Sequence, residues 1–188
     1  ATAQADSAPM VAVTGQVPVA MIGKDAFQES DIIGMANPVV KYSFQPRLPG
    51  EVPEAVRKGF YIAETGRPGP VLLDIPKDVQ QNEAPMDFPD EFTIQGYHPW
   101  NDPDVASVQK AVDMLVNSER PIILAGGGTI ISSAFAELQS VAETLMIPVV
   151  TTFKGKGAFP ENHPLSLGPI GMHGHAEANK MMAEADCV

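Results

Sequence analysis

Cysteine, basic side chains and long hydrophobic runs are all scarce in this sequence of 188 residues. Its one cysteine, Cys187, excludes an internal disulfide and a zinc site built on cysteines, which fits a reducing compartment. No apolar run approaches the ~18–20 residues that cross a bilayer, and the first residues lack the basic-then-apolar pattern of a secretion signal. We therefore expect a cytoplasmic protein with no membrane partner.

Positive charge is in short supply. Twelve lysine and arginine residues face 23 aspartate and glutamate residues, which gives a formal net charge of −11. Such a surface repels a polyphosphate backbone, and no basic cluster offsets the repulsion, so the composition argues against a nucleic-acid partner. The apolar content of 44% is sufficient for a hydrophobic core, which predicts a globular protein.

The first half of the chain alternates between strand and helix patterns, as α/β proteins do. Residues 10–14 form a short β-branched run, which predicts a buried strand. Apolar side chains recur at helical spacing in residues 51–65, which predicts an amphipathic helix whose buried face holds Val52, Val56, Phe60 and Ala63. The continuous apolar run 69–76 predicts a parallel strand that is covered on both faces.

A second α/β unit is expected after a proline-rich stretch. Residues 81–104 hold several prolines and no helical spacing, which predicts a linker between domains at 1–80 and 105–188. Strands are predicted at 121–125 and 147–152. One helix should bury Val105, Val108, Val112 and Leu115. A second should bury Phe135, Leu138, Ala142 and Leu145, with Ser132 or Ser133 as its cap. The predicted fold class is therefore α/β, with parallel sheets flanked by helices.

A glycine triplet follows the strand predicted at 121–125. Without a Cβ, the backbone N–H groups of Gly126, Gly127 and Gly128 could approach an anionic ligand closely. The dinucleotide fingerprint is incomplete, because Ile131 stands where a third small residue is needed. The triplet alone leaves a nucleotide or phosphate site and a plain tight turn as equal alternatives.

Two basic side chains have both a functional and a structural interpretation. His173 lies among glycines before a helix predicted at 176–184, and no carboxylate stands at the spacing that a metal site with His175 would need. His173 should lie along a flat ligand or cap that helix. Arg67 should satisfy the last carbonyls of the 51–65 helix, or direct its guanidinium at a phosphate or carboxylate.

The stretch GKDAFQESD, residues 23–31, lies beyond the carboxyl end of the first predicted strand, where parallel sheets place their sites. Phe27 would offer an apolar wall, and Gln28 a neutral donor and acceptor for a substrate whose charge changes during reaction. The alternative is a small structural cluster around Phe27. Glu29 and Asp31 should be solvated or cap the segment that follows.

Three ordered segments resemble one enzyme family. VTGQVPVAMIGKDAFQESD (13–31), TGRPGPVLLDIPKDVQ (65–80) and GMHGHAEAN (171–179) are similar to the large catalytic subunit of acetolactate synthase, a thiamine diphosphate enzyme. The resemblance runs over essentially the whole chain. It implies the C-terminal part of a pyrimidine-binding domain, followed by most of a Rossmann-like, FAD-binding middle domain. The chain is therefore expected to be a fragment, with the thiamine-activating glutamate and the Mg²⁺ ligands outside it.

The resemblance also implies roles for particular residues. Gln28 and Phe27 would lie beside the thiamine and the reacting carbonyl, Pro18 and Lys41 would line the channel, and Arg67 would contact FAD or substrate. The residues that match the FAD-holding stretches are Gly126, Gly127, Gly128, Thr152, Phe153, Gly171, Met172 and His173.

The implied reaction condenses two pyruvates, or pyruvate and 2-ketobutyrate, with loss of CO2. A homodimer or homotetramer and a small regulatory subunit are the implied partners. Glyoxylate carboligase, pyruvate oxidase and the FAD-free acetolactate synthase remain related alternatives, although the DAFQE and GMHG segments favour the first interpretation. A non-catalytic nucleotide-binding module is the alternative of a different class, and the isolated 188 residues are expected to be inactive.

Overall fold

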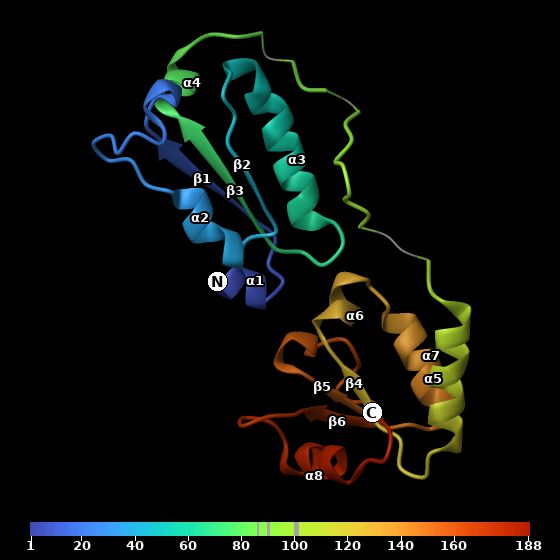
Figure 1. Cartoon of the computed structure of the whole chain (residues 1–188). Coiled ribbons are helices and arrows are strands. Elements are labelled where there is room, and N and C mark those ends of the chain that lie inside the picture. Colours follow the sequence, from blue (N-terminus) through green and yellow to red (C-terminus); the bar gives the residue numbers. More distant parts are fainter. Residues whose placement is uncertain (86, 90, 100–101) are drawn as a thin grey trace. The chain divides into compact units, whose positions relative to one another are not determined.

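The computed structural model describes residues 1–85, 87–89, 91–99 and 102–188, in two compact units, Ala1–Asn101 and Asp102–Val188. Both units contain a three-stranded parallel sheet with helices against it (Figure 1). The predicted fold class is confirmed. In the part of the chain that the structure describes, no helix is long and apolar enough to span a bilayer.

The sheet of the first unit has the strand order β1-β3-β2, with β1 at Met10–Gln16, β2 at Tyr42–Phe44 and β3 at Pro70–Pro76. The helices of this unit are α1 (Thr2–Ala5), α2 (Ile32–Ala36), α3 (Val52–Glu64) and α4 (Lys77–Gln81). Short 3-10 turns lie at Val19–Met21, Asn37–Val39 and Pro49–Glu51. The central strand β3 is buried along almost its whole length, as its continuous apolar run predicts. The strand predicted at residues 10–14 exists as β1, but its predicted burial is wrong, because Met10 and Val13 are 47% and 63% exposed.

Helix α3 contacts all three strands, and its fully buried face shares only Ala63 with the predicted one. Phe60 is 52% exposed, so its predicted burial is wrong. Small residues form much of the buried face instead, which holds Pro53, Ala55, Gly59, Ile62 and Ala63. A Cβ on Gly59 would lie 3.4 Å from Leu73 Cδ2, so the glycine lets the helix backbone approach β3. The helix was assigned correctly because its spacing is helical, but large apolar side chains did not identify the buried stripe.

Part of the predicted linker packs against the first unit. Tyr97 and Ile94 pack against the buried cluster of Ile62, Ala63 and Val71. The Tyr97 hydroxyl also lies 2.9 Å from the carbonyl of Thr65 and 3.2 Å from the Lys41 amine. Within the predicted range 81–104, Met86, Asp90, Trp100 and Asn101 lie outside the described residues.

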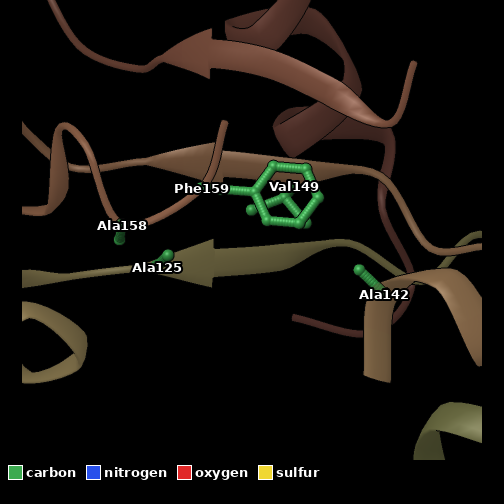
Figure 2. Close-up of a cluster of buried hydrophobic side chains, with 5 residues drawn as sticks. All are labelled: Ala125, Ala142, Val149, Ala158 and Phe159. Atoms are coloured by element: carbon green, nitrogen blue, oxygen red, sulfur yellow. The ribbon is translucent and has the colours of Figure 1, made fainter. Parts of the chain in front are cut away.

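The sheet of the second unit has the order β4-β5-β6, with β4 at Ile123–Ala125, β5 at Val149–Thr151 and β6 at Ser166–Pro169. Its helices are α5 (Val105–Asn117), α6 (Gly127–Ile131), α7 (Phe135–Leu145) and α8 (Ala176–Glu184), and a 3-10 turn lies at Phe153–Gly155. Figure 2 shows the cluster on one face of the sheet, with Phe159 beside Val149 and with Ala125, Ala142 and Ala158 around them. The neighbouring Val150 belongs to a second cluster with Ile122 and Ala178, because successive strand residues point to opposite faces.

Three predictions for this unit are wrong at least in part. Helix α7 buries Ala142 as predicted, but Phe135 and Leu145 on the same predicted face are 41% and 37% exposed. Helix α5 exists, but Val105, Val108 and Val112 on its predicted buried face are 79%, 51% and 43% exposed. The predicted serine cap of α7 is also absent, because Ala134 occupies the N-cap position and Ser132 Oγ donates to the Gly128 carbonyl at 2.8 Å. Ser132 instead lies at the C-cap of α6, and its hydroxyl bonds one turn back within that helix.

Candidate functional site

The first candidate region is the loop 17–31, which follows β1 at the carboxyl edge of its sheet (Figure 1). Phe27 is 89% exposed at this edge, so it does not anchor a small structural cluster. Gln28 has a φ of 67°, in the left-handed region that side chains other than glycine rarely adopt. Strained backbone of this kind persists only where the surrounding contacts determine it, and it is common at functional sites.

Backbone hydrogen bonds to two carboxylates hold this loop internally. Glu29 accepts from the N–H groups of Gly23, of Lys24 at 3.3 Å and of Ala26 at 2.9 Å. The bonds from Gly23 and Ala26 hold the pKa of Glu29 below its ordinary value. Asp31 accepts from the Gly34 N–H at 2.9 Å and so caps α2, which confirms its predicted capping role.

A buried carboxylate lies below the loop. Asp74, at the carboxyl end of β3, has no exposed surface and accepts from Thr14 Oγ1 at 2.8 Å, Gln16 Nε2 at 3.2 Å and Gln45 Nε2 at 2.7 Å. The sequence contained a signal for this contact, because Asp74 is the single charge in an otherwise apolar buried run. Asp78 accepts from the Val19 N–H at 3.1 Å and so fixes the start of the loop.

The structure does not bring all the predicted residues of the first unit together. Pro18 lies in the loop with Phe27 and Gln28, immediately before the Val19–Met21 turn. Lys41 instead lies at the amino edge of the sheet, where its backbone N–H donates to the carbonyl of Pro70, the first residue of β3. The seven residues of β3 span about 20 Å between the two edges.

Lys41 and Arg67 have structural partners at that amino edge. The Lys41 amine donates to the carbonyls of Ile62 and, at 2.8 Å, of Thr65. Arg67 donates to Ser7 Oγ at 2.8 Å and to the Ala5 carbonyl at 3.3 Å. The prediction that Arg67 satisfies the last carbonyls of its helix is therefore wrong, because Lys41 meets the end of α3.

The second candidate region is the carboxyl edge of the β4-β5-β6 sheet. All the predicted residues of this unit lie directly after its strands: the glycine triplet after β4, Thr152 and Phe153 after β5, and Gly171, Met172 and His173 just after β6. Phe153 is 89% and Met172 is 94% exposed. Two uncovered apolar side chains at the edge where parallel sheets bind ligands fit the faces of a flat ring system.

The local packing gives only part of the reason for the glycines in this region. A Cβ on Gly128 would meet nothing within 4 Å, and one on Gly126 would meet only Thr152, at 3.9 Å. A Cβ on Gly127 would come within 3.2 Å of Lys154 Cβ, so that glycine has a packing role. The open space at positions 126 and 128 fits a close approach of a ligand to the backbone, as a phosphate-containing cofactor requires.

An asparagine that the sequence did not reveal fixes the loop after β6. Asn179 Oδ1 accepts from the Gly171 N–H at 2.8 Å, and Asn179 Nδ2 donates to the Gly171 carbonyl at 3.0 Å. Gly171 has a φ of 106°, which suits glycine. His173 does not cap α8, since His175 occupies the N-cap position without a side-chain bond there.

Comparison with known proteins agrees with this arrangement. Residues 108–188 match the model of the thiamine pyrophosphate enzyme central domain. A relative named "Probable acetolactate synthase large subunit" in Methanocaldococcus jannaschii is 51% identical over 99% of this chain. The acetolactate synthase large subunit of Buchnera aphidicola subsp. Schlechtendalia chinensis is 44% identical over 100% of the chain, and the isozyme 3 large subunit of Escherichia coli is 40% identical over 100%. The chain spans about one third of the length of each, at 32%, 33% and 33%.

A solved structure supports the same conclusion. An X-ray structure described as a thiamin diphosphate-dependent enzyme from Mycobacterium smegmatis superposes with a TM-score of 0.72. The superposed region covers 90% of this chain and 32% of the Mycobacterium smegmatis chain, and the two sequences are 26% identical. Residues 108–188 are therefore similar to the central domain of thiamine pyrophosphate enzymes, and along its length the chain resembles one third of an acetolactate synthase large subunit.

Proposed function

We propose that these residues are part of an acetolactate synthase that condenses two pyruvates, or pyruvate and 2-ketobutyrate, with loss of CO2. The products are 2-acetolactate and 2-aceto-2-hydroxybutyrate, precursors of branched-chain amino acids. The observation that carries the proposal is 51% identity over 99% of the chain to the acetolactate synthase relative of Methanocaldococcus jannaschii. The position of Phe27 and Gln28 on an ordered loop at the carboxyl edge of a parallel sheet supports it.

The proposed roles in the first unit belong to its loop 17–31. Thiamine diphosphate, with Mg²⁺, supplies the carbon nucleophile and the electron sink that removal of CO2 from a 2-keto acid requires. Phe27 would exclude water from the reacting carbon with its uncovered ring. Gln28 would donate a hydrogen bond to a substrate oxygen, and its neutral amide would not repel an anionic keto acid as a carboxylate would. Pro18 would line the approach to this edge.

The proposed role of the second unit is to hold FAD at its carboxyl edge. Gly126 and Gly128 would admit the phosphates close to the backbone, while Phe153, Met172 and His173 would cover the ring systems. Gly127, Thr152 and Gly171 would shape the backbone around them. Because the proposed condensation has no net redox change, the flavin would serve structure and assembly.

Lys41 and Arg67 would not reach the loop 17–31 of their own unit, and they would join that loop from another subunit. Both lie at the amino edge of their own sheet, with partners there. In a homodimer or homotetramer, that edge of one subunit could face the catalytic edge of another. A small regulatory subunit would be a further partner, and the proposed location is the cytoplasm.

Flavin titration and turnover assays test the proposal on the 188-residue chain. We expect FAD to bind, with quenching of flavin fluorescence, and no acetolactate to form when pyruvate, thiamine diphosphate and Mg²⁺ are added. Absence of FAD binding would contradict the role of the second unit. FAD binding without any activity in the next test would favour a non-catalytic nucleotide-binding module.

The reaction itself needs a complete large subunit. Residues 1–188 would replace the matching third of the Methanocaldococcus jannaschii relative, and the hybrid would be supplied with pyruvate, with glyoxylate, or with pyruvate, oxygen and inorganic phosphate. We expect acetolactate from pyruvate and at least a tenfold loss of kcat in Gln28→Glu. Turnover of glyoxylate alone, or oxygen-dependent formation of acetyl phosphate, would identify a carboligase or oxidase instead.

A further inference from the structure

We propose that Asp74, acting through Gln16, is a positioning residue that sets the path of the loop carrying Phe27 and Gln28. The inference rests on the proposed function only for its catalytic consequence. Its structural part concerns contacts within the first unit alone, between the carboxyl ends of the three strands and the loop 17–31.

Asp74 is built into the sheet as an acceptor and not as half of an ion pair. Its carboxylate is fully buried, and its three hydrogen-bond donors in the described structure are one hydroxyl and two amides. Thr14 and Gln16 lie in β1, and Gln45 is the residue after β2. The Asp74 side chain on β3 therefore joins all three strands near their carboxyl ends. A buried carboxylate is costly unless its oxygens are satisfied, which holds the donors in place.

Gln16 transmits this order to the loop. Its Nε2 carries two hydrogens; one bonds to Asp74 Oδ2 at 3.2 Å and the other to the Ser30 carbonyl at 2.8 Å. Its Oε1 accepts from the Val17 N–H at 2.9 Å. A carboxylate oxygen can only accept, so Asp74 Oδ2 must face the Nε2 end of the Gln16 amide. This contact fixes the orientation in which the amide also meets the Ser30 carbonyl. The two ends of the loop, at Val17 and Ser30, are thus held by one side chain.

The position of Gln28 follows from these contacts. Ser30 is two residues from Gln28, and Glu29 between them binds the backbone at Gly23, Lys24 and Ala26. The residues that follow Gln28 are therefore both fixed, Glu29 through its carboxylate and Ser30 through its carbonyl. These contacts hold Gln28 in its left-handed backbone conformation. Releasing Ser30 frees this conformation to relax, and the amide of Gln28 would then leave the place where a substrate oxygen could meet it.

Hydrogen exchange followed by mass spectrometry tests the positioning role on the 188-residue chain without cofactor or substrate. The readout is the exchange rate in residues 19–30, together with the rate of tryptic cleavage after Lys24, which is the only lysine or arginine in the loop. Gln16→Leu and Asp74→Leu should each speed both rates at least about fivefold, since the opening of a local segment controls them.

Two controls separate positioning from general support of the sheet. Thr14→Val and Gln45→Leu each remove one bond to the same carboxylate but none to the loop, and they should change both rates by less than about twofold. Asp74→Asn should retain the loop, because its remaining oxygen can accept from Gln16 while the Thr14 hydroxyl turns to accept from the new amide. In the Gln16→Leu/Asp74→Leu double variant, the rates should equal those of Gln16→Leu.

Equal acceleration by Gln45→Leu and Gln16→Leu, or additive effects in the double variant, would overturn the proposal. So would unchanged loop exchange in Gln16→Leu, whose fold is checked through the exchange of β3 and of the second unit. If Asp74→Leu fails to fold, Gln16→Leu and Asp74→Asn still decide the question. None of these readouts uses turnover, so their failure is distinguishable from failure of the proposed synthase activity.

Discussion

Replacing Gly155 with alanine should selectively destabilise the second unit. A Cβ on Gly155 would lie 2.1 Å from the Ala125 carbonyl oxygen, 2.8 Å from its carbon and 3.0 Å from Gly126 Cα. All three are backbone atoms, so no side chain can turn away from the new methyl group. The end of β4 and the turn after β5 must therefore move apart.

The cost of this movement can be worked from the contacts it breaks. Forcing one extra methyl group into a packed site costs about 1–3 kcal/mol. The same carbonyl of Ala125 accepts from the Thr152 N–H at 3.0 Å, and loss of that bond adds about 1 kcal/mol. We expect the free energy of unfolding of the second unit to fall by about 2–4 kcal/mol.

Pulsed hydrogen exchange across a urea series measures this loss in each unit separately. Peptides from β5 and β6 report the second unit, and peptides from β3 serve as the internal reference. Gly128→Ala is the matched control: its Cβ meets nothing within 4 Å, and alanine suits the interior of α6, so stability should stay the same or rise by up to about 1 kcal/mol. A Gly155→Ala unit as stable as the original would refute the packing argument.

Three further outcomes are expected. Lys41→Met should lower the stability of the first unit by about 1.5–3 kcal/mol, measured by urea unfolding, because the carbonyls at the end of α3 lose a charged donor. Gly128→Ala should weaken FAD binding in a fluorescence titration at least about tenfold while the fold is retained, since the methyl group would occupy open space proposed for the ligand. Finally, bonds from the Glu119 and Arg120 N–H groups lower the pKa of Asp186. The stability that Asp186 gives the second unit should therefore be fully present above the ordinary pKa of 3.8, and it should be lost as the pH falls through the lower pKa of the folded state. Hydrogen exchange measured from pH 6 downwards reports the protection of those two amides. Their protection should fall over that acidic range in the original chain but not in Asp186→Asn.

Regular spacing predicted the elements of this fold well, while burial was harder to predict. The strand β3 was evident because a parallel strand covered on both faces is apolar throughout. The buried stripe of α3 is predicted correctly only at Ala63, because Ala55 and Gly59 bury little surface but allow close approach, whereas Phe60 is apolar and exposed. Hydrophobic spacing counts large side chains, and close packing between a helix and a sheet also selects small ones.

Part of the arrangement at the candidate site follows from chain position alone. The exposure of Phe27 at a sheet edge agrees with its position after a strand. The hydrogen bonds of Gln16, Gln45 and Asp74 were not predictable, since they join residues that only the strand order β1-β3-β2 brings together. A charged residue inside a buried run indicates that partners exist, but the partners' identities depend on register.

The parallel pairing of β1 with β3 also affects how the protein is made. The hydrogen bond from Thr14 to Asp74 joins residues 60 positions apart, and the whole β1–β3 register has a similar separation. At a synthesis rate of about 5–20 residues per second, β1 leaves the ribosome roughly 3–12 s before its only strand partner in the described structure exists. During that interval Val11, which packs against the cluster of Ile62, Ala63 and Val71 in the folded unit, has no sheet to join, so translation speed between residues 16 and 70 should influence how much of the chain aggregates before it folds.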